Sequence, residues 1–314
     1  MSVSRGDSSA WQGVLDWPVM SKRSAKQASQ ETGCLYLVGT PIGNMEDITL
    51  RALRVLKEAD VVLCEDTRQT QKLLQHYGLG KRLVSYHAHN EMTRAPEVVI
   101  ELEQGAKAAL VSDAGMPMIS DPGHRLVALC LRHHIPVVPV PGPSALVTAL
   151  AASGLPTEEF VFVGFLPAQA GARRQALKAL AGEPRTLVFY EAPHRIEGAL
   201  ADAAELLGAR PGVIAREVTK MHEEFLRGRL PELLDYVGKN PLRGEITLLI
   251  GAAAPEETEG SRAARASEDV PLRARVAQLM QDPAVDRKAA LKQAARERGL
   301  TKREAYKQLL VERG

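Results

Sequence analysis

Cysteine is scarce in this chain of 314 residues, which contains only Cys34, Cys64 and Cys130. The number is odd, the spacing is wide and no CxxC pair occurs, so we expect reduced thiols in a cytoplasmic protein. Long apolar runs are missing as well. No stretch approaches the roughly 18–20 residues that span a bilayer, and the N-terminus has no sustained apolar segment that would predict a signal peptide.

Several familiar catalytic motifs are also absent. The chain has no GxSxG elbow, no HExxH, no GxxxxGK[ST] loop and no GxGxxG fingerprint. Serine hydrolysis, zinc chemistry and phosphoryl transfer therefore lose their usual sequence support. His87 and His89 stand two residues apart without an evident third ligand, so no metal is expected.

The chain does have enough apolar residues, 45%, to fill two compact cores. Apolar strands alternate with helices up to about residue 152, a pattern that predicts a parallel sheet. Further on, two strands follow each other without a helix, so the second sheet should be mixed. The predicted organisation is α/β: a disordered extension (1–32), an N-terminal α/β domain (33–156), a second α/β domain (157–252), a linker (253–270) and a helical domain (271–314).

The C-terminal domain combines helical periodicity with an excess of basic side chains. Two helices are predicted, about 286–298 and 301–311, and the second opens with a capping box at Thr301–Glu304. The pair has the form of a helix-turn-helix, and its charge indicates contact with a polyanion. A plain helical hairpin with a solvated charged face is the alternative.

Glycine and proline gather in loops at the carboxyl ends of the predicted strands. The strand at 108–111 runs into the loop 112–123, which holds two glycines, two prolines and two aspartates. Related loops lie at 39–44 and 141–145, the latter with Ser144 as a predicted helix N-cap. Ligands bind at this edge of α/β sheets, although each loop alone could be an ordinary turn. A cleft lined by main chain would suit a nucleoside derivative.

These loops belong to a longer ordered set of motifs. The set is GTPIGN (39–44), CEDTR (64–68), SYHAHNE (85–91), SDAGMPMISDPG (112–123), PVPGPSALVTALAASGL (139–155), FVGFLP (162–167), YEAPHRI (190–196), AREVTKMHEEFLRG (215–228) and GEITLLI (244–250). In this order it resembles the tetrapyrrole methylase superfamily and, within it, the ribosomal RNA small subunit methyltransferase I branch. The resemblance covers 33–251, and the terminal helices resemble that branch's helix-turn-helix domain.

The resemblance implies a class III methyltransferase fold with S-adenosylmethionine in a cleft between two α/β domains. It implies an rRNA (cytidine-2′-O-)-methyltransferase that acts on 16S rRNA in the decoding region of the small ribosomal subunit, as a homodimer. By position, the donor would be held by Gly39, Pro41, Gly43, Gly115, Met116, Pro117, Ile119, Ser144, Ala145, Phe165, Leu166, Tyr190, Glu245 and Ile246. Met116 replaces an aspartate of many relatives, so main-chain contacts are expected there.

Methylation of a ribose hydroxyl benefits from a base that accepts its proton, and such a base typically contributes roughly 10²–10⁴-fold. Candidates at strand ends of the donor-binding domain are Glu65, Asp66 and His87, with Glu217 in the second domain. Each could instead be a cap, an ion-pair partner or an RNA contact. Predicted RNA-binding residues are Arg68, His194, Arg195, Arg216, Arg298, Lys302, Arg303 and Lys307.

Three other functions share this donor cleft or this fold. The first is a small-molecule methyltransferase of the tetrapyrrole or cobalamin pathway, which the basic tail disfavours. The second is a diphthine-synthase-like protein methyltransferase. The third is a non-catalytic RNA-binding assembly protein, which would not bind S-adenosylmethionine.

Overall fold

The computed structural model describes residues 33–252, 272–281, 286–297 and 305. The chain divides into two compact units, 1–253 and 254–314. The predicted extension (1–32) and linker (253–270) lie outside the described residues.

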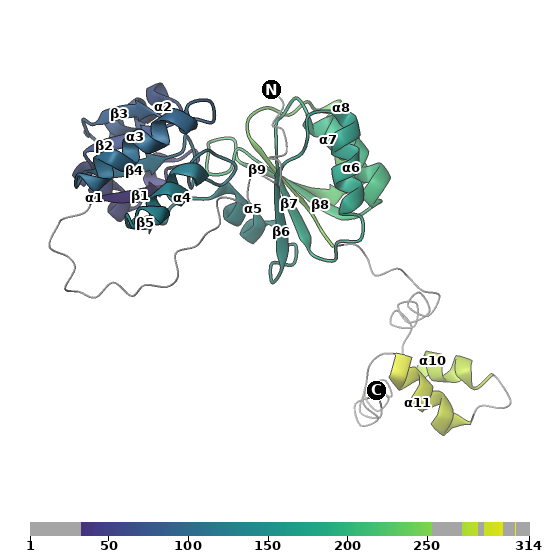
Figure 1. Ribbon diagram of the computed structural model, residues 1–314. Coiled ribbons are helices and arrows are strands. Elements are labelled where there is room, and N and C mark those ends of the chain that lie inside the picture. The colour runs from purple at the N-terminus through teal and green to yellow at the C-terminus, as the bar shows by residue number, and fades with distance from the viewer. Residues whose placement is uncertain (1–32, 253–271, 282–285, 298–304, 306–314) are drawn as a thin grey trace. The chain divides into compact units, whose positions relative to one another are not determined.

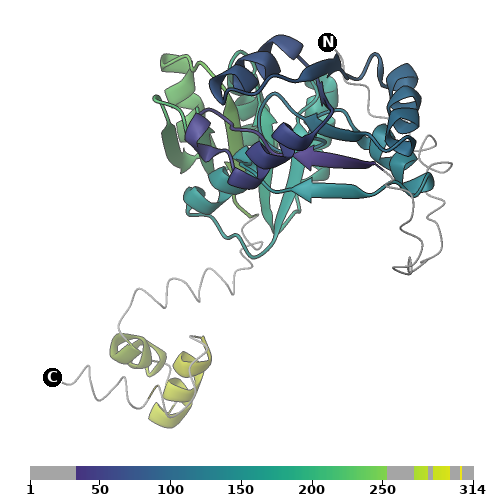
Figure 2. The same ribbon diagram turned by 90° about the vertical axis from the view of Figure 1, so that its left-hand side faces the viewer.

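The first half of the larger unit is a parallel sheet of five strands in the order β3-β2-β4-β1-β5 (Figure 1). The strands are β1 Cys34–Val38, β2 Val61–Cys64, β3 Arg82–Ser85, β4 Lys107–Val111 and β5 Val137–Val140. They alternate with the 3₁₀ turn η3 Met45–Asp47 and the helices α1 Leu50–Glu58, α2 Thr67–His76, α3 Glu91–Glu103 and α4 His124–Arg132. Figure 2 views the unit from the side of this sheet.

Helices cover both faces of the first sheet, which explains why its central strands are apolar throughout. Every residue of β2 is buried. Ala52, Val55 and Leu56 of α1 and Leu74 of α2 pack on one face. Side chains of α3 and α4 pack on the other face.

The second sheet is mixed, in the order β6-β7-β10-β8-β9. The strands are β6 Phe160–Phe165, β7 Thr186–Glu191, β8 Pro211–Arg216, β9 Glu224–Arg229 and β10 Ile246–Ile250. Only β6 and β7 run parallel, while β10 pairs antiparallel with β7 and β8, and β9 with β8. The helices are α5 Ala145–Ser153, α6 Ala170–Ala179, α7 Ile196–Leu207 and α8 Leu230–Lys239, and the last three lie together on one side of the sheet (Figure 1).

One apolar cluster joins the two sheets within this unit. Ile42, from the loop after β1, is buried with Ala149 and Leu150 of α5 and with Val213 and Leu249 of the second sheet. The carboxyl edge of the first sheet thus meets one face of the second. The predicted α/β class, with a parallel and then a mixed sheet, is confirmed.

In the smaller unit, α10 Leu272–Leu279 packs on α11 Arg287–Glu297 through an apolar cluster that includes Leu272, Val276 and Ala294. Helix α10 was not predicted, because its apolar stripe is only eight residues long and follows a linker-like segment. Of the predicted helix at 301–311, only Ala305 is described, and it is buried. None of the described helices is long and apolar enough to cross a membrane.

Candidate functional site

A pocket of about 470 Å³ opens where the carboxyl edge of the first sheet meets the second sheet. This volume lies within the roughly 300–1,000 Å³ that is usual for small-molecule sites. Its walls come from the loops after β1, β2, β4 and β5, and from the ends of β6, β7, β8 and β10. The lining residues are Ile42, Glu65, Ser112–Met116, Ile119–Asp121, Ser144, Ala145, Phe165, Tyr190–Pro193, Ala215, Val218 and Gly244–Thr247.

Thr40 fixes the loop 112–123 to the loop that follows β1. Its N–H donates to the Gly115 carbonyl at 2.9 Å, and the Gly115 N–H donates back to the Thr40 carbonyl at 3.1 Å. The Thr40 hydroxyl donates to the carbonyl of Ser112 at 3.0 Å. Thr40 was not predicted as a site residue, since a threonine between glycine and proline carries no periodic signal.

The loop 112–123 holds an unusual backbone. Met118 and Ser120 have φ angles of 71° and 66°, and Gly115 has 87°. A non-glycine residue with a positive φ of this size costs about 1–3 kcal/mol in conformational energy, so it persists only where the surrounding structure imposes it. Such outliers gather at functional sites, and here two of them lie within the loop that forms one wall of the pocket.

Five carboxylate residues line the pocket, and three of them, Glu65, Asp113 and Asp121, come from the loops of the first sheet. Partial desolvation and the charges of Asp121 and Asp113 raise the pKa of Glu65, while His87 opposes this shift. Desolvation also raises the pKa of Asp113 and Asp121. Paired carboxylates with raised pKa values are the expected mark of an acid–base site or of a site for a cationic ligand. The sequence analysis named Glu65 but assigned no role to the two aspartates.

Asp66 is not part of the pocket wall. Its side chain caps α2 by accepting from the Arg68 N–H at 2.8 Å, and it pairs with the Arg68 guanidinium at 2.7 Å. These contacts lower the pKa of Asp66 to about 2, which makes it a poor base. His87 does not line the pocket either. Among the predicted bases of this domain, the geometry favours Glu65.

Phe165 and Tyr190 form an aromatic part of the wall, with ring centroids 5.7 Å apart. Burial raises the pKa of the Tyr190 phenol, and hydrogen bonds with the Leu146 backbone and the Ser144 side chain oppose this. Ser144 stands at the N-cap of α5, but its side chain makes no capping hydrogen bond. The predicted N-cap position of Ser144 is thus confirmed, although its hydroxyl does not bond the backbone of α5.

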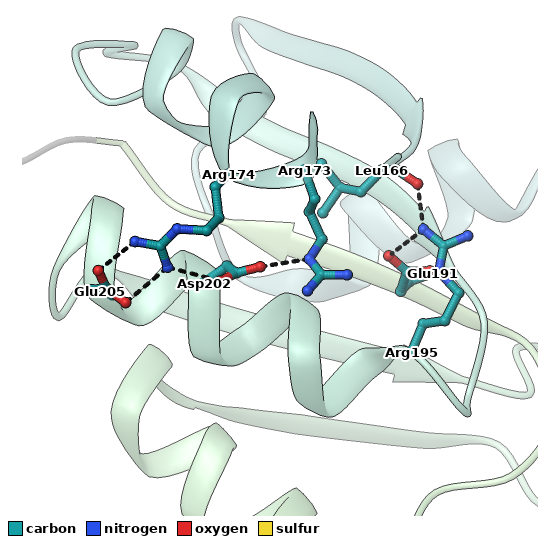
Figure 3. A network of polar contacts seen from close by, with 7 residues as sticks. All are labelled: Leu166, Arg173, Arg174, Glu191, Arg195, Asp202 and Glu205. Carbon is teal, nitrogen blue, oxygen red and sulfur yellow. Dashed lines mark hydrogen bonds and ion pairs between the residues drawn. The ribbon is translucent and has the colours of Figure 1, made fainter. Parts of the chain in front are cut away.

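A buried ion pair connects the ends of β6 and β7 (Figure 3), and its carboxylate, Glu191, also lines the pocket. The side chain of Glu191 is fully buried; it accepts from the Ala192 N–H at 2.9 Å and pairs with Arg195 at 3.1 Å. Arg195 also donates to the Leu166 carbonyl. Its guanidinium is thus occupied inside the fold, which argues against the predicted contact with RNA.

We expect Arg195→Gln to destabilise the protein by about 3–5 kcal/mol, because it leaves the Glu191 carboxylate buried without its partner. Affinity for S-adenosylhomocysteine should fall as well, while the salt dependence of RNA binding stays unchanged. Urea unfolding and calorimetric titration measure both effects. Arg82→Gln is the matched control, since Arg82 pairs with Glu101 at 3.0 Å on the surface and its loss should cost less than about 1 kcal/mol. If RNA binding by Arg195→Gln depended less steeply on salt than that of the wild type, Arg195 would contact RNA after all.

The other predicted site residues divide between the pocket wall and its support. Those on the wall are Gly115, Met116, Ile119, Ser144, Ala145, Phe165, Tyr190, Glu245 and Ile246. Those that do not line it are Gly39, Pro41, Gly43, Pro117 and Leu166. Wall residues that the sequence analysis did not name as site residues include Ile42, Asp113, Asp121, Glu191, Gly244 and Thr247.

The predicted RNA-binding residues lie in different environments. The side chain of Arg68 is 85% exposed and pairs with Asp66. Arg216 is bound internally, to Glu224 at 3.0 Å and to the Arg243 carbonyl at 3.3 Å. His194 lines a second hollow beside the pocket. Arg298, Lys302, Arg303 and Lys307 lie outside the described residues.

Comparisons with a family model and with curated proteins both identify relatives of this chain. The family model of Tetrapyrrole (Corrin/Porphyrin) Methylases matches residues 34–234. Ribosomal RNA small subunit methyltransferase I of Halalkalibacterium halodurans is 46% identical over 294 residues, covering 91% of this chain and 98% of that protein. The protein of the same name from Escherichia coli O157:H7 is 45% identical, covering 92% and 99%.

Solved structures show the fold in related enzymes. Uroporphyrin-III C-methyl transferase from Thermus thermophilus, complexed with S-adenyl homocysteine, is 27% identical with a TM-score of 0.52, covering 70% of this chain and 97% of that one. The methyltransferase CobJ, at 19% identity and a TM-score of 0.55, shares the fold. The family match over most of the chain and the identity to curated relatives agree: the chain belongs to the tetrapyrrole methylase family and, within it, to the ribosomal RNA small subunit methyltransferase I branch.

Proposed function

We propose that this protein transfers the methyl group of S-adenosylmethionine to the ribose 2′-hydroxyl of a cytidine in 16S rRNA, in the decoding region of the small ribosomal subunit. The names of its relatives support rRNA as the substrate. The main observation in support of methyl transfer is a pocket lined by both the glycine- and proline-rich loop 112–123 and Glu65. The pKa of the Glu65 carboxylate is raised.

The pocket residues fit S-adenosylmethionine. Ile42, Val218 and Ile246 offer apolar surface for an adenine ring, and the strained loop presents main chain at Gly115 and Met116. The three carboxylates complement a positively charged donor, whose sulfonium supplies an already activated methyl group. What remains for the protein is alignment, which can be worth about 7–11 kcal/mol of the barrier.

We assign to Glu65 the role of accepting the proton of the attacking hydroxyl. A base works best when its pKa lies near the working pH, and the neighbouring Asp113 and Asp121 move Glu65 in that direction. Asp113 also accepts from the Asp66 N–H at 3.3 Å, which ties the loop after β2 to the loop after β4. This contact holds Glu65 beside the loop 112–123.

The deciding experiment is transfer of labelled methyl groups to small ribosomal subunits and to naked 16S rRNA, followed by mapping of the methylated nucleotide. We expect one cytidine to carry label on its ribose, which makes the adjoining phosphodiester resistant to alkali. Label on a base would overturn the 2′-O assignment. Label on porphyrins but on no RNA would favour a tetrapyrrole acceptor, and no binding of the donor would favour a non-catalytic protein.

A chain that ends at Ala253 should keep its affinity for S-adenosylhomocysteine and bind small subunits more weakly, because the compact unit 254–314 is lost. Lys288 and Lys292 of α11 are exposed in that unit. Each lost phosphate contact should flatten the logarithmic salt slope by about 0.7–0.9. Filter binding at several salt concentrations measures this, and an unchanged slope would remove the unit from RNA recognition.

A homodimer in the cytoplasm completes the proposal. Sedimentation of the purified chain measures its mass, and a monomer at micromolar concentration would contradict the dimer.

A further inference from the structure

A second hollow of about 340 Å³ adjoins the donor pocket. Pro193 and Gly244 line both spaces, so the two are neighbours without an intervening layer of protein. The remaining walls come from the start of α7, the end of α8 and the segment 241–243 that leads into β10. No role in donor binding falls on these walls.

The basic side chains near this hollow differ in whether they already have an ion-pair partner. Lys220 pairs with Glu217 at 2.8 Å and with Glu245 at 3.0 Å. Arg195 and Arg216 are paired as well, with Glu191 and Glu224. These three cations therefore have partners within the fold.

Arg243 is the exception on the wall of the hollow. Its carbonyl accepts from the Arg216 guanidinium at 3.3 Å, which anchors its backbone. Its own side chain is exposed and has no ion pair with any residue that the structure describes. An anchored arginine with an unused guanidinium is suited to a phosphate, which it can hold in bidentate fashion.

The rest of the hollow matches the other parts of a nucleotide. Pro193, Pro241 and Leu242 supply flat or apolar surface, against which a base can stack. Glu197 adds a carboxylate, which accepts from an amino group or a hydroxyl. A free inorganic anion would use only the donors of the hollow, Arg243 and His194, whereas a nucleotide also uses the apolar surface and the carboxylate.

We propose that this hollow binds a nucleotide that flanks the methylated one in single-stranded RNA, with Arg243 on its phosphate. The inference rests on the proposed function, since it takes the acceptor to be RNA. Pro193 and Gly244 line both spaces, so a neighbour of the nucleotide whose ribose is in the donor pocket can reach the hollow. Unstacked bases of this kind are what proteins recognise in RNA.

The test is Arg243→Gln against Lys178→Gln. Lys178 is an exposed cation in the last turn of α6 that lines neither space. In Arg243→Gln, the KM for small ribosomal subunits should rise about tenfold, as for loss of a charge-assisted hydrogen bond, with the KM for S-adenosylmethionine unchanged. The salt slope should flatten by about 0.7. Lys178→Gln should alter none of these.

A binding measurement keeps this inference separate from the proposed function. Anisotropy of a labelled single-stranded oligoribonucleotide compares the wild type, Arg243→Gln and Lys178→Gln without any methyl transfer. Weaker binding in Arg243→Gln alone supports the hollow, even if the methylated position proves to be another one. Equal binding by all three, or an equal KM for subunits, overturns it.

Discussion

Glu65→Gln should slow methyl transfer by about 10²–10⁴-fold, because the amide cannot accept the proton of the ribose hydroxyl. Glutamine has nearly the shape of glutamate, so the fold and the affinity for S-adenosylhomocysteine should change little. Single-turnover transfer to small ribosomal subunits measures the chemical step apart from product release. The donor affinity comes from calorimetric titration of the same preparation.

The pH dependence of the wild type provides a second measure of the same role. The base works only when it is deprotonated, and the pKa of Glu65 is raised by desolvation, Asp121 and Asp113. The rate should therefore fall as the pH is lowered through this raised pKa, at a higher pH than for an ordinary glutamate. In Glu65→Gln this limb of the profile should disappear.

Asp66→Asn is the matched control, since Asp66 is the next residue and also carries a carboxylate. Its carboxylate caps α2 and pairs with Arg68, and its pKa of about 2 leaves it ionised over the whole range. Asparagine is also a good N-cap, so stability should change by less than about 1 kcal/mol. If Asp66→Asn were as slow as Glu65→Gln, or if Glu65→Gln were as fast as the wild type, Glu65 would not be the base.

Much of the fold follows from the sequence because its signals are local. Runs such as Val61–Cys64 are buried on both faces, and a strand of that kind leaves a continuous apolar stretch that is visible without a structure. The paired strands β8 and β9 have no helix between them, which identifies the mixed sheet. The loops of the pocket are also visible, since glycine and proline mark their positions.

Which group each charged side chain contacts cannot be predicted from the sequence, because the partners lie far along the chain. Arg195 meets the carbonyl of Leu166, 29 residues away, and Arg216 meets that of Arg243, 27 residues away. Both were predicted to bind RNA, since a basic residue beside a candidate site gives the same signal whether or not it has an internal partner. Arg243 was not predicted to bind RNA, because the sequence does not show that its side chain lacks such a partner. Only the fold shows that the neighbouring cations have ion-pair partners, while Arg243 has none among the residues that the structure describes.

Gly39 shows how a residue can matter to the donor pocket without lining it. A Cβ on Gly39 would lie 2.7 Å from the Cα of Gly142 and 2.8 Å from the Sδ of Met116. A Cβ on Gly142 would in turn lie 2.7 Å from the Cα of Gly39. The loops after β1 and β5 therefore touch through main chain alone, and Met116 of the pocket wall lies against the same contact.

Gly39→Ala and Gly142→Ala should each destabilise the protein by about 1–3 kcal/mol, as overpacking of a tight contact does. Neither loop can yield without moving the wall at Met116, so affinity for S-adenosylhomocysteine should fall in both variants. Gly171→Ala is the control: a Cβ there meets nothing within 4 Å, and alanine in the first turn of α6 should be neutral or stabilise by about 0.5–1 kcal/mol.

The double variant separates this explanation from two independent defects. Either alanine already forces the two loops apart, so the second should cost less than it does alone, and the pair should be non-additive by about 0.5–3 kcal/mol. Urea unfolding of the four proteins in the cycle gives this coupling, and calorimetry gives the parallel loss of donor affinity. Additive losses, or full donor affinity in either single variant, would mean that the contact between the glycines does not hold the pocket in shape.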